Sequence, residues 1–151
     1  MKTIEESIEI QVPVTTAYNQ WTQFESFPEF MDGIERVEQR DDRHLHWVAK
    51  IGGDEREWDA EITEQHPDHR VAWKAIDQPG PNGVVTFHKL DEGHTKVMVQ
   101  MAYEPEGARE SIGSFVGLDS HRVKNDLESF KEFIEGRAHE TGAWRGNVEE
   151  N

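Results

Sequence analysis

The sequence predicts a single α+β domain in which an antiparallel β-sheet is covered on one face by a long C-terminal helix. Residues 34 to 103 alternate apolar and polar side chains, with turn residues between the runs. Residues 108 to 137 carry apolar side chains at helical spacing. The 151 residues show no internal repeat, and a chain of this length buries about 70% of its unfolded surface around one core.

The N-terminal elements are expected to be a strand and a short helix. In residues 3 to 12, TIEESIEIQV, Ile and Val alternate with Glu, Ser and Gln, which is typical of a half-buried strand. A helix is expected over residues 13 to 24, because it begins at a proline whose missing N–H needs no partner in a first turn. Residues 25 to 31 are interrupted by Pro28, which disfavours helix just before it. We expect a second short helical turn or a loop there.

Six further strands follow from the period-two pattern. Gly, Pro, Asn and Asp fill the connections between the runs, as turns require. Together with the N-terminal strand this makes about seven strands, and the short connections favour antiparallel neighbours. The expected strands are Ile34–Arg40, His44–Gly52, Glu55–Glu64, Arg70–Asp77, Gly83–Leu90 and Thr95–Tyr103.

One face of the predicted sheet is apolar and the other is wet. Trp47, Trp58 and Trp73 take the apolar parity of three successive strands, and each is followed two residues later by an alanine. The opposite parity of residues 55 to 61 is entirely acidic, so that face must contact water. The apolar parity continues through Val85, Phe87, Val97, Val99, Met101 and Tyr103.

A helix of about thirty residues, from about Ala108 to Arg137, is expected to cover the apolar face. Gly113 and Gly117 each cost ~1 kcal/mol relative to Ala in a helix interior. Either the helix is broken near Gly117 and Asp119, or the backbone passes close to another group there. The apolar stripe consists of Ile112, Phe115, Val116, Val123, Leu127, Phe130, Phe133 and Ile134.

The composition excludes several classes of function. The net charge of -15, from 31 Asp+Glu against 16 Lys+Arg, repels nucleic acid and anionic membrane surfaces. The chain has no cysteine, which excludes disulfides and thiolate chemistry. Without a signal-peptide pattern or a long apolar run, we expect a cytoplasmic monomer or homodimer with no stable membrane insertion. The acid excess favours a salt-rich cytoplasm or a GC-rich genome.

Residues 1–137 are expected to form the domain, and residues 138–151 an irregular tail.

Several separated motifs carry a resemblance to a known family. They are ESIEIQVPVTTAYNQWTQFESFPEFM at the start, REWDAEITEQHPDHRVAWKA in the sheet, GVVTF followed by TKV in the last hairpin, and DLESFKEFIEGR and ETGAWRG near the end. The element order is that of the helix-grip fold, and the motifs resemble the START-like superfamily, in particular its polyketide cyclase/dehydrase and coenzyme Q-binding branch. The resemblance runs over nearly the whole chain. It implies a hydrophobic cavity between the curved sheet and the long helix, in which members carry lipids, quinones, hormones or polyketides.

Given such a cavity, the ligand is expected to contact large side chains of the sheet, the long helix and the segment after the first helix. Alternation of Trp and Ala on the sheet fits ordinary core packing as well as a cavity wall. Trp21, on the inner stripe of the first helix, is expected in the core. The expected ligand-binding residues are Phe27, Phe30, Met31, Trp47, Trp58, Trp73, Phe87, Met101, Tyr103, Phe115 and Asp119.

Catalytic and metal chemistry have few candidates in the sequence. Asp119 near the helix seam would have a raised pKa if it faced an apolar cavity, and Tyr103 could offer a hydroxyl to a ligand. The alternatives are a helix N-cap and an ordinary core tyrosine. Two histidine pairs, at positions 44 and 46 and at positions 66 and 69, lack a third ligand at a telling distance. We therefore expect no metal and no cofactor.

Three functions are compatible with these residues. The first is binding of a hydrophobic small molecule, such as a lipid, a quinone or a polyketide, between the sheet and the C-terminal helix. The second is a polyketide aromatase/cyclase, since enolisation and aldol closure of a held poly-β-keto chain need proton transfer alone. The third is a protein-interaction module with a collapsed cavity.

Overall fold

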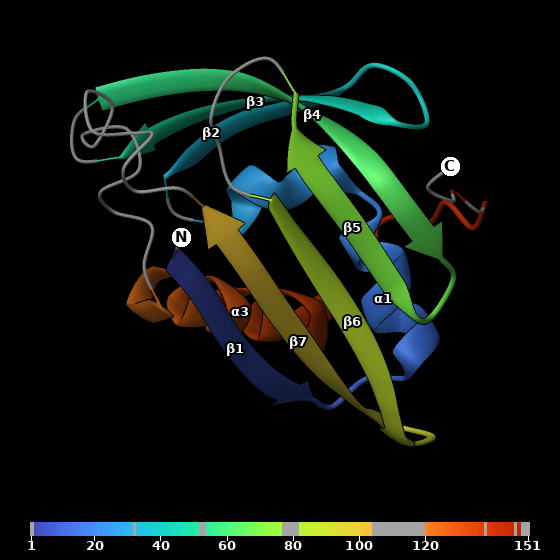
Figure 1. Ribbon diagram of the computed structural model, residues 1–151. Coiled ribbons are helices and arrows are strands. Elements are labelled where there is room, and N and C mark those ends of the chain that lie inside the picture. The colour runs from blue at the N-terminus through green and yellow to red at the C-terminus, as the bar shows by residue number, and fades with distance from the viewer. Residues whose placement is uncertain are drawn as a thin grey trace.

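The computed structural model describes residues 2–31, 33–51, 54–76, 82–103, 120–137, 139–146 and 148. Within these residues, seven strands form one antiparallel sheet that curls around the helices (Figure 1). The strand order is β1-β7-β6-β5-β4-β3-β2, so β1 pairs with the last strand and the others follow the chain as a meander. The strands are β1 (Lys2–Ile10), β2 (Ile34–Gln39), β3 (His44–Ile51), β4 (Asp54–His66), β5 (Arg70–Ala75), β6 (Asn82–Asp91) and β7 (His94–Tyr103). The predicted fold class is confirmed.

The described helical elements lie on the concave face of this sheet (Figure 1). They are α1 (Val14–Trp21), the 3₁₀ helix η1 (Phe24–Glu29) and α3 (Ser120–Arg137). Pro13 was expected as the first helical residue, but it adopts an extended conformation and is the N-cap, so α1 begins one residue later, at Val14. Pro28 lies inside η1, so of the two expected alternatives, a short helical turn or a loop, the structure has the helical turn. The expected helix residues 108 to 119, with both glycines of interest, lie outside the described part of the chain.

The core occupies the space between the concave face and the helices, and the predicted faces of the sheet are confirmed. Ala60, Val71, Val85 and Val97 on the apolar parity are fully buried. On α3 the expected stripe is buried at four positions, namely Val123, Leu127, Phe130 and Ile134. Each buried apolar side chain of this size contributes about 1.5–3 kcal/mol to folding.

A bulge in β4 changes which side chains face the core. The register with β5 shifts between Ile62 and Glu64, so one extra residue is inserted at that point. As a result Gln65, which continued alternation would place outside, is almost completely buried. Its backbone N–H and C=O pair with Val148 at 2.7 and 2.9 Å, which attaches the end of the chain to the sheet.

The C-terminal segment packs against α1 through polar side chains. Gln20 accepts a hydrogen bond from the Thr141 N–H (2.8 Å), and Asn19 accepts one from the Arg145 guanidinium (2.6 Å). Arg145 also pairs with Asp68 in the turn after β4 (2.9 Å). Buried amides need such partners, so these bonds explain why an acidic, polar tail is fixed to a helix whose inner face is apolar.

Candidate ligand-binding site

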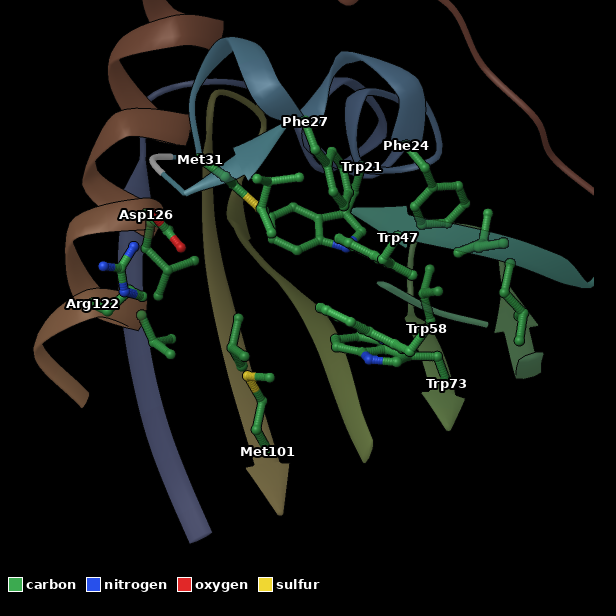
Figure 2. A pocket seen from close by; sticks show the side chains of 17 residues that line it. Trp21, Phe24, Phe27, Met31, Trp47, Trp58, Trp73, Met101, Arg122 and Asp126 are labelled. Atoms are coloured by element: carbon green, nitrogen blue, oxygen red, sulfur yellow. The ribbon is translucent and has the colours of Figure 1, made fainter. Parts of the chain in front are cut away.

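A cavity of about 120 Å³ lies between the concave face of the sheet, η1 and α3 (Figure 2). Fifteen of the seventeen described residues that line it are apolar, and the remaining two are Arg122 and Asp126. An engineered apolar cavity of roughly 150 Å³ is large enough to bind benzene. The described space is somewhat smaller than that cavity, so it is comparable with the room that a single aromatic ring needs. The apolar lining consists of Trp21, Phe24, Phe27, Met31, Ile34, Leu45, Trp47, Trp58, Ile62, Val71, Trp73, Val99, Met101, Val123 and Leu127.

The sheet side of the cavity is a wall of tryptophans. Trp47 and Trp58 stand directly opposite each other on β3 and β4, and their rings are parallel, with an interplanar angle of 1° and centroids 6.0 Å apart. Trp73 on β5 pairs with Ile62 of β4 and lines the same cavity (Figure 2). The sequence-based expectation that the three tryptophans share one face is therefore confirmed.

The position of Trp73 depends on a glycine. Gly83 on β6 is its direct cross-strand partner, and a Cβ added at this glycine would lie 2.6 Å from a ring carbon of Trp73. That separation is much shorter than a van der Waals contact, so the indole can lie flat against the neighbouring strand because residue 83 has no side chain.

Gly83→Ala is expected to move the Trp73 ring and to lower the free energy of unfolding by about 1–3 kcal/mol, as overpacking does. Urea denaturation measures the loss, and near-ultraviolet circular dichroism reports the displaced indole. Gly136→Ala is the matched control, because a Cβ there meets nothing within 4 Å and lies on α3. That variant is expected to gain up to about 1 kcal/mol. A stable Gly83→Ala variant with an unchanged spectrum would contradict the close contact.

The aromatic cluster after α1 divides between cavity and core. A 3₁₀ helix has three residues per turn, so Phe24, Phe27 and Phe30 form one row along η1, with centroids 5.3 and 5.5 Å apart. The first two and Met31 line the cavity. The row ends at α3, where the Phe30 ring contacts Phe130. Phe30 therefore lies beside the cavity and not on its described wall.

Phe87 was expected on the cavity wall, but in the structure it packs in the core and is not among the described lining residues. Its ring packs edge-to-face against Tyr18 at 5.4 Å and against Trp21 at 6.4 Å, so α1 covers it. Trp21 was expected purely in the core, but it is buried and also lines the cavity. Trp47, Trp58, Trp73 and Met101 line the cavity as expected. Among the other candidates, Phe115, Asp119 and the side chain of Tyr103 lie outside the described residues.

Two charged residues of α3 line the cavity, and the sequence did not single them out as candidates. Arg122 and Asp126 are separated by one helical turn, and both lie on α3 at the edge of the cavity (Figure 2). Each directly precedes a residue of the apolar stripe, Val123 and Leu127 respectively, so each lies on the flank of the stripe. This flanking pattern was the available signal in the sequence. A carboxylate and a guanidinium at the edge of an apolar cavity can orient a polar group of a ligand or exchange a proton with it.

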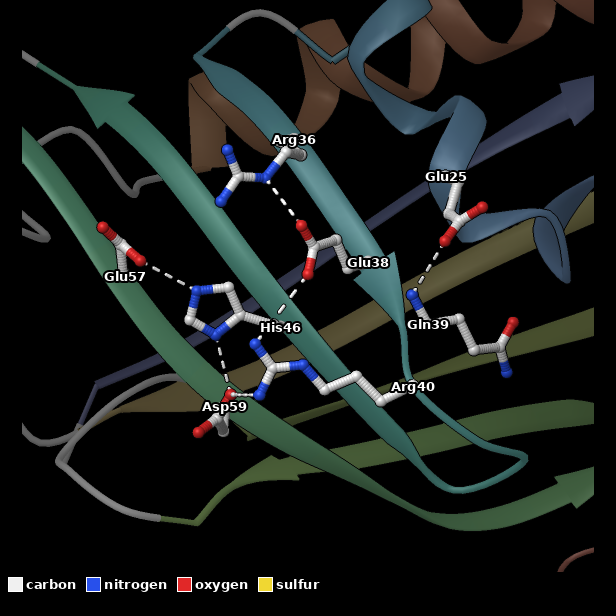
Figure 3. Close-up of polar contacts among 8 residues, drawn as sticks. All are labelled: Glu25, Arg36, Glu38, Gln39, Arg40, His46, Glu57 and Asp59. Carbon is white, nitrogen blue, oxygen red and sulfur yellow. Dashed lines mark hydrogen bonds and ion pairs between the residues drawn. The ribbon is translucent and has the colours of Figure 1, made fainter.

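The outer face of β2, β3 and β4 carries a charged network (Figure 3). His46 Nδ1 donates to Asp59 at 2.7 Å and His46 Nε2 donates to Glu57 at 2.9 Å. Hydrogen bonds to Asp59 and Glu57 raise the pKa of His46 above its ordinary value of 6.5. Arg40 pairs with Asp59 at 3.5 Å and with Glu38 at 3.8 Å. The predicted acidic face is therefore partly neutralised by these cations.

Because the pKa of His46 is raised on folding, its stabilising effect is fully present below the unfolded pKa and is lost as the pH rises through the folded pKa. His46→Gln is therefore expected to cost more stability at about pH 5.5 than at about pH 8.5, measured by urea denaturation at both values. In an Asp59→Asn background this pH difference should shrink, since a main partner of the imidazolium is removed. An equal cost at both pH values would contradict the assignment.

The described residues offer neither a metal cluster nor a membrane span. No group of three or more His, Asp or Glu side chains is arranged to hold a metal ion within this part of the chain. His44, from one of the two histidine pairs noted in the sequence, hydrogen-bonds to Asp41 at 2.8 Å. No helix among the described residues is long and apolar enough to cross a membrane.

The curled antiparallel sheet, the C-terminal helix and the apolar cavity between them define a helix-grip domain of the START-like superfamily. A family model described as "Polyketide cyclase / dehydrase and lipid transport" matches residues 10–134, and the chain belongs to this family. The resemblance to the START-like superfamily and its polyketide cyclase/dehydrase branch is thus confirmed.

Known proteins support this assignment. The chain is 56% identical over 149 residues to an uncharacterised 17.2 kDa protein of Streptomyces lincolnensis, covering 98% of this chain and 99% of that protein. Its fold is similar to the Zhui aromatase/cyclase of a Streptomyces strain, with a TM-score of 0.73, 14% identity, and coverage of 95% and 99% of the two chains. A START superfamily protein from Mycobacterium smegmatis gives a TM-score of 0.67 at 13% identity, over 87% and 98%. At these identities the two structures show the shared fold.

Proposed function

We propose that this protein binds a hydrophobic small molecule of polyketide type in the cavity between the sheet and α3. The observation that carries the proposal is the lining, because fifteen of its seventeen described residues are apolar and four of them are tryptophans. Ligand pockets typically combine such apolar walls with a few polar groups that fix orientation. The family description, which names polyketide cyclases and lipid transport, supports the same class of ligand.

The arrangement of the lining indicates how a ligand would lie. The aromatic wall of β3, β4 and β5 stands on one side, and Arg122 and Asp126 stand on α3 at another edge (Figure 2). A ligand with an apolar ring and a polar end fits this division, with its ring against the indoles and its polar end toward α3. The open space also disfavours the interaction module with a collapsed cavity, since a collapsed core would fill this volume with side chains.

Native mass spectrometry of freshly purified protein tests this proposal. We expect an additional mass that dissociates from the protein on mild activation. Solvent extraction of the purified protein is expected to release an aromatic or polyketide-like compound of that mass. Saturable quenching of tryptophan fluorescence by an aromatic ketone provides a second readout, because four cavity residues are tryptophans. Bare protein from several hosts together with absent saturable quenching would refute ligand binding.

A second candidate, a polyketide aromatase/cyclase, rests on the carboxylate in the cavity lining. Asp126 lines the otherwise largely apolar cavity together with Arg122, and cyclisation by enolisation needs a proton-transferring group beside a held chain. Turnover of a poly-β-keto substrate that is lost in Asp126→Asn, while ligand binding and the melting temperature are retained, would establish the enzyme. Reversible binding without turnover in the unaltered protein would establish the carrier.

A further inference from the structure

Four buried polar atoms belong to α1, the end of β4 and the turn that follows it. They are the Tyr18 hydroxyl oxygen, the two side-chain amide atoms of Gln65 and Oδ1 of Asp68, and none of them makes a hydrogen bond within the described part of the chain. Tyr18 is 0% exposed and Gln65 is 1% exposed. Folded proteins rarely leave such atoms unpaired, so this polar cluster of three side chains needs a further hydrogen-bonding partner.

The three side chains of the polar cluster lie close together. Burial raises the pKa of Tyr18, and the Gln65 side chain beside the hydroxyl opposes this effect. The Arg145 charge lowers the same pKa and the Asp68 charge raises it, so both charged groups also lie near the hydroxyl. Arg145 connects them, since its guanidinium lies over the Tyr18 ring at 5.5 Å and pairs with Asp68 Oδ2 at 2.9 Å. The unpaired atoms therefore belong to one site, which the C-terminal segment covers.

The hydrogen-bonding groups of the cluster determine what can bind there. The Tyr18 hydroxyl and the Gln65 NH₂ group donate, whereas the Gln65 carbonyl and the Asp68 carboxylate accept. A cation would satisfy the acceptors and leave the donors unpaired, and an anion would be repelled by Asp68. A water molecule accepts two hydrogen bonds and donates two, and buried waters in proteins have two to four polar partners. Two donors and two acceptors match that requirement.

We propose that the polar cluster is a binding site for one internal water molecule, which accepts hydrogen bonds from Tyr18 and Gln65 and donates to Asp68 Oδ1 and the Gln65 carbonyl. None of these three residues is among the described residues that line the ligand cavity, so the inference is independent of the proposed function. The water joins α1 to the end of β4. It also explains how the bulge in β4 can bury a glutamine side chain, because the water supplies the partner that the amide lacks.

Nuclear magnetic resonance of the full chain in solution tests the site directly. The Gln65 side-chain NH₂ signals are assigned by their loss in Gln65→Met, which keeps a side chain of similar length. We expect cross-peaks between these protons and water whose signs are opposite in NOE and ROE spectra, as a long-lived bound water gives. Proton exchange with solvent gives the same sign in both. Relay through the Tyr18 hydroxyl is excluded if the cross-peaks persist in Tyr18→Phe, where Gln65 and Asp68 still hold the water.

Stability measurements provide a second readout. Tyr18→Phe is expected to increase the unfolding equilibrium constant by about fivefold in urea denaturation, the effect of one lost hydrogen bond. In a Gln65→Met background the same substitution should have a smaller effect, because the water has already lost its amide partner. Tyr103→Phe is the matched control, since it removes the hydroxyl of the other tyrosine in the chain. It should leave the water cross-peaks of Gln65 unchanged.

The alternatives give different results. If the Tyr18 hydroxyl were bonded directly to the Gln65 amide, Tyr18→Phe would still cost stability, but no water cross-peaks would be seen, and the proposal would be overturned. If the hydroxyl were truly unpaired, Tyr18→Phe would be as stable as the wild-type protein or more stable, which would also overturn it. Water cross-peaks together with the fivefold change would establish the site.

Discussion

Replacing Phe130 by alanine is expected to lower the free energy of unfolding by about 3–5 kcal/mol, the usual cost of deleting a buried phenyl ring. Phe130 is completely buried in the middle of α3. Its ring contacts Trp21 of α1 at 5.0 Å and Phe30 after η1 at 5.3 Å. The three helical elements on the concave face are thus joined at this side chain. Its removal weakens the contact that holds α3 over the cavity.

Urea denaturation followed by tryptophan fluorescence measures this loss, and Phe133→Ala is the matched control on the same helix. Phe133 is half-buried, contacts Phe30 at 5.1 Å and lies beneath the Arg137 guanidinium. Since part of its ring already faces solvent, we expect less than half the loss seen at Phe130. Equal losses at the two positions would show that the aromatic contact between α3 and α1 adds no particular stability.

The fold could be predicted from the sequence because its strongest signals are local. Alternation of apolar and polar residues in β3 to β7 assigns each side chain to a face, and short Gly, Pro and Asp turns leave antiparallel pairing as the simple connection. The bulge in β4 could not be predicted in this way, since nothing in the pattern around Ile62 and Glu64 marks the inserted residue. For this reason the buried side chain of Gln65 was not expected.

The candidate site could be predicted in part, and the differences have a common cause. Trp47, Trp58 and Trp73 were placed correctly because a strand fixes the direction of each side chain by parity. Parity alone does not show which of the inward-facing residues are covered by α1. For this reason Phe87 was expected on the cavity wall, whereas it packs in the core against α1. The charged pair on α3 was missed because a flank position on a helix becomes a cavity wall only when the helix is placed against the sheet.

Two buried aliphatic residues of α3, Leu127 and Ile134, differ in whether they line the cavity, and this difference leads to the strongest functional prediction. Leu127→Phe is expected to weaken binding of an aromatic probe by about tenfold or more, because the added ring volume occupies space that a ligand needs. Leu127 lines the cavity and is 1% exposed. The new ring has room in the cavity, so the free energy of unfolding should change by less than about 1.5 kcal/mol. Fluorescence titration and urea denaturation provide the two measurements.

Ile134→Phe is the control that separates filling a cavity from overpacking a core. Ile134 is completely buried on the same helix, and it is not one of the residues that line the cavity. An added ring there has to displace packed neighbours, so we expect a loss of about 1–3 kcal/mol in stability and little change in the affinity of the remaining folded protein. Thus one substitution should affect binding without stability, and the other stability without binding. If both variants lost stability alike and bound the probe alike, the space between the sheet and α3 would be ordinary core, and the ligand would have to bind elsewhere.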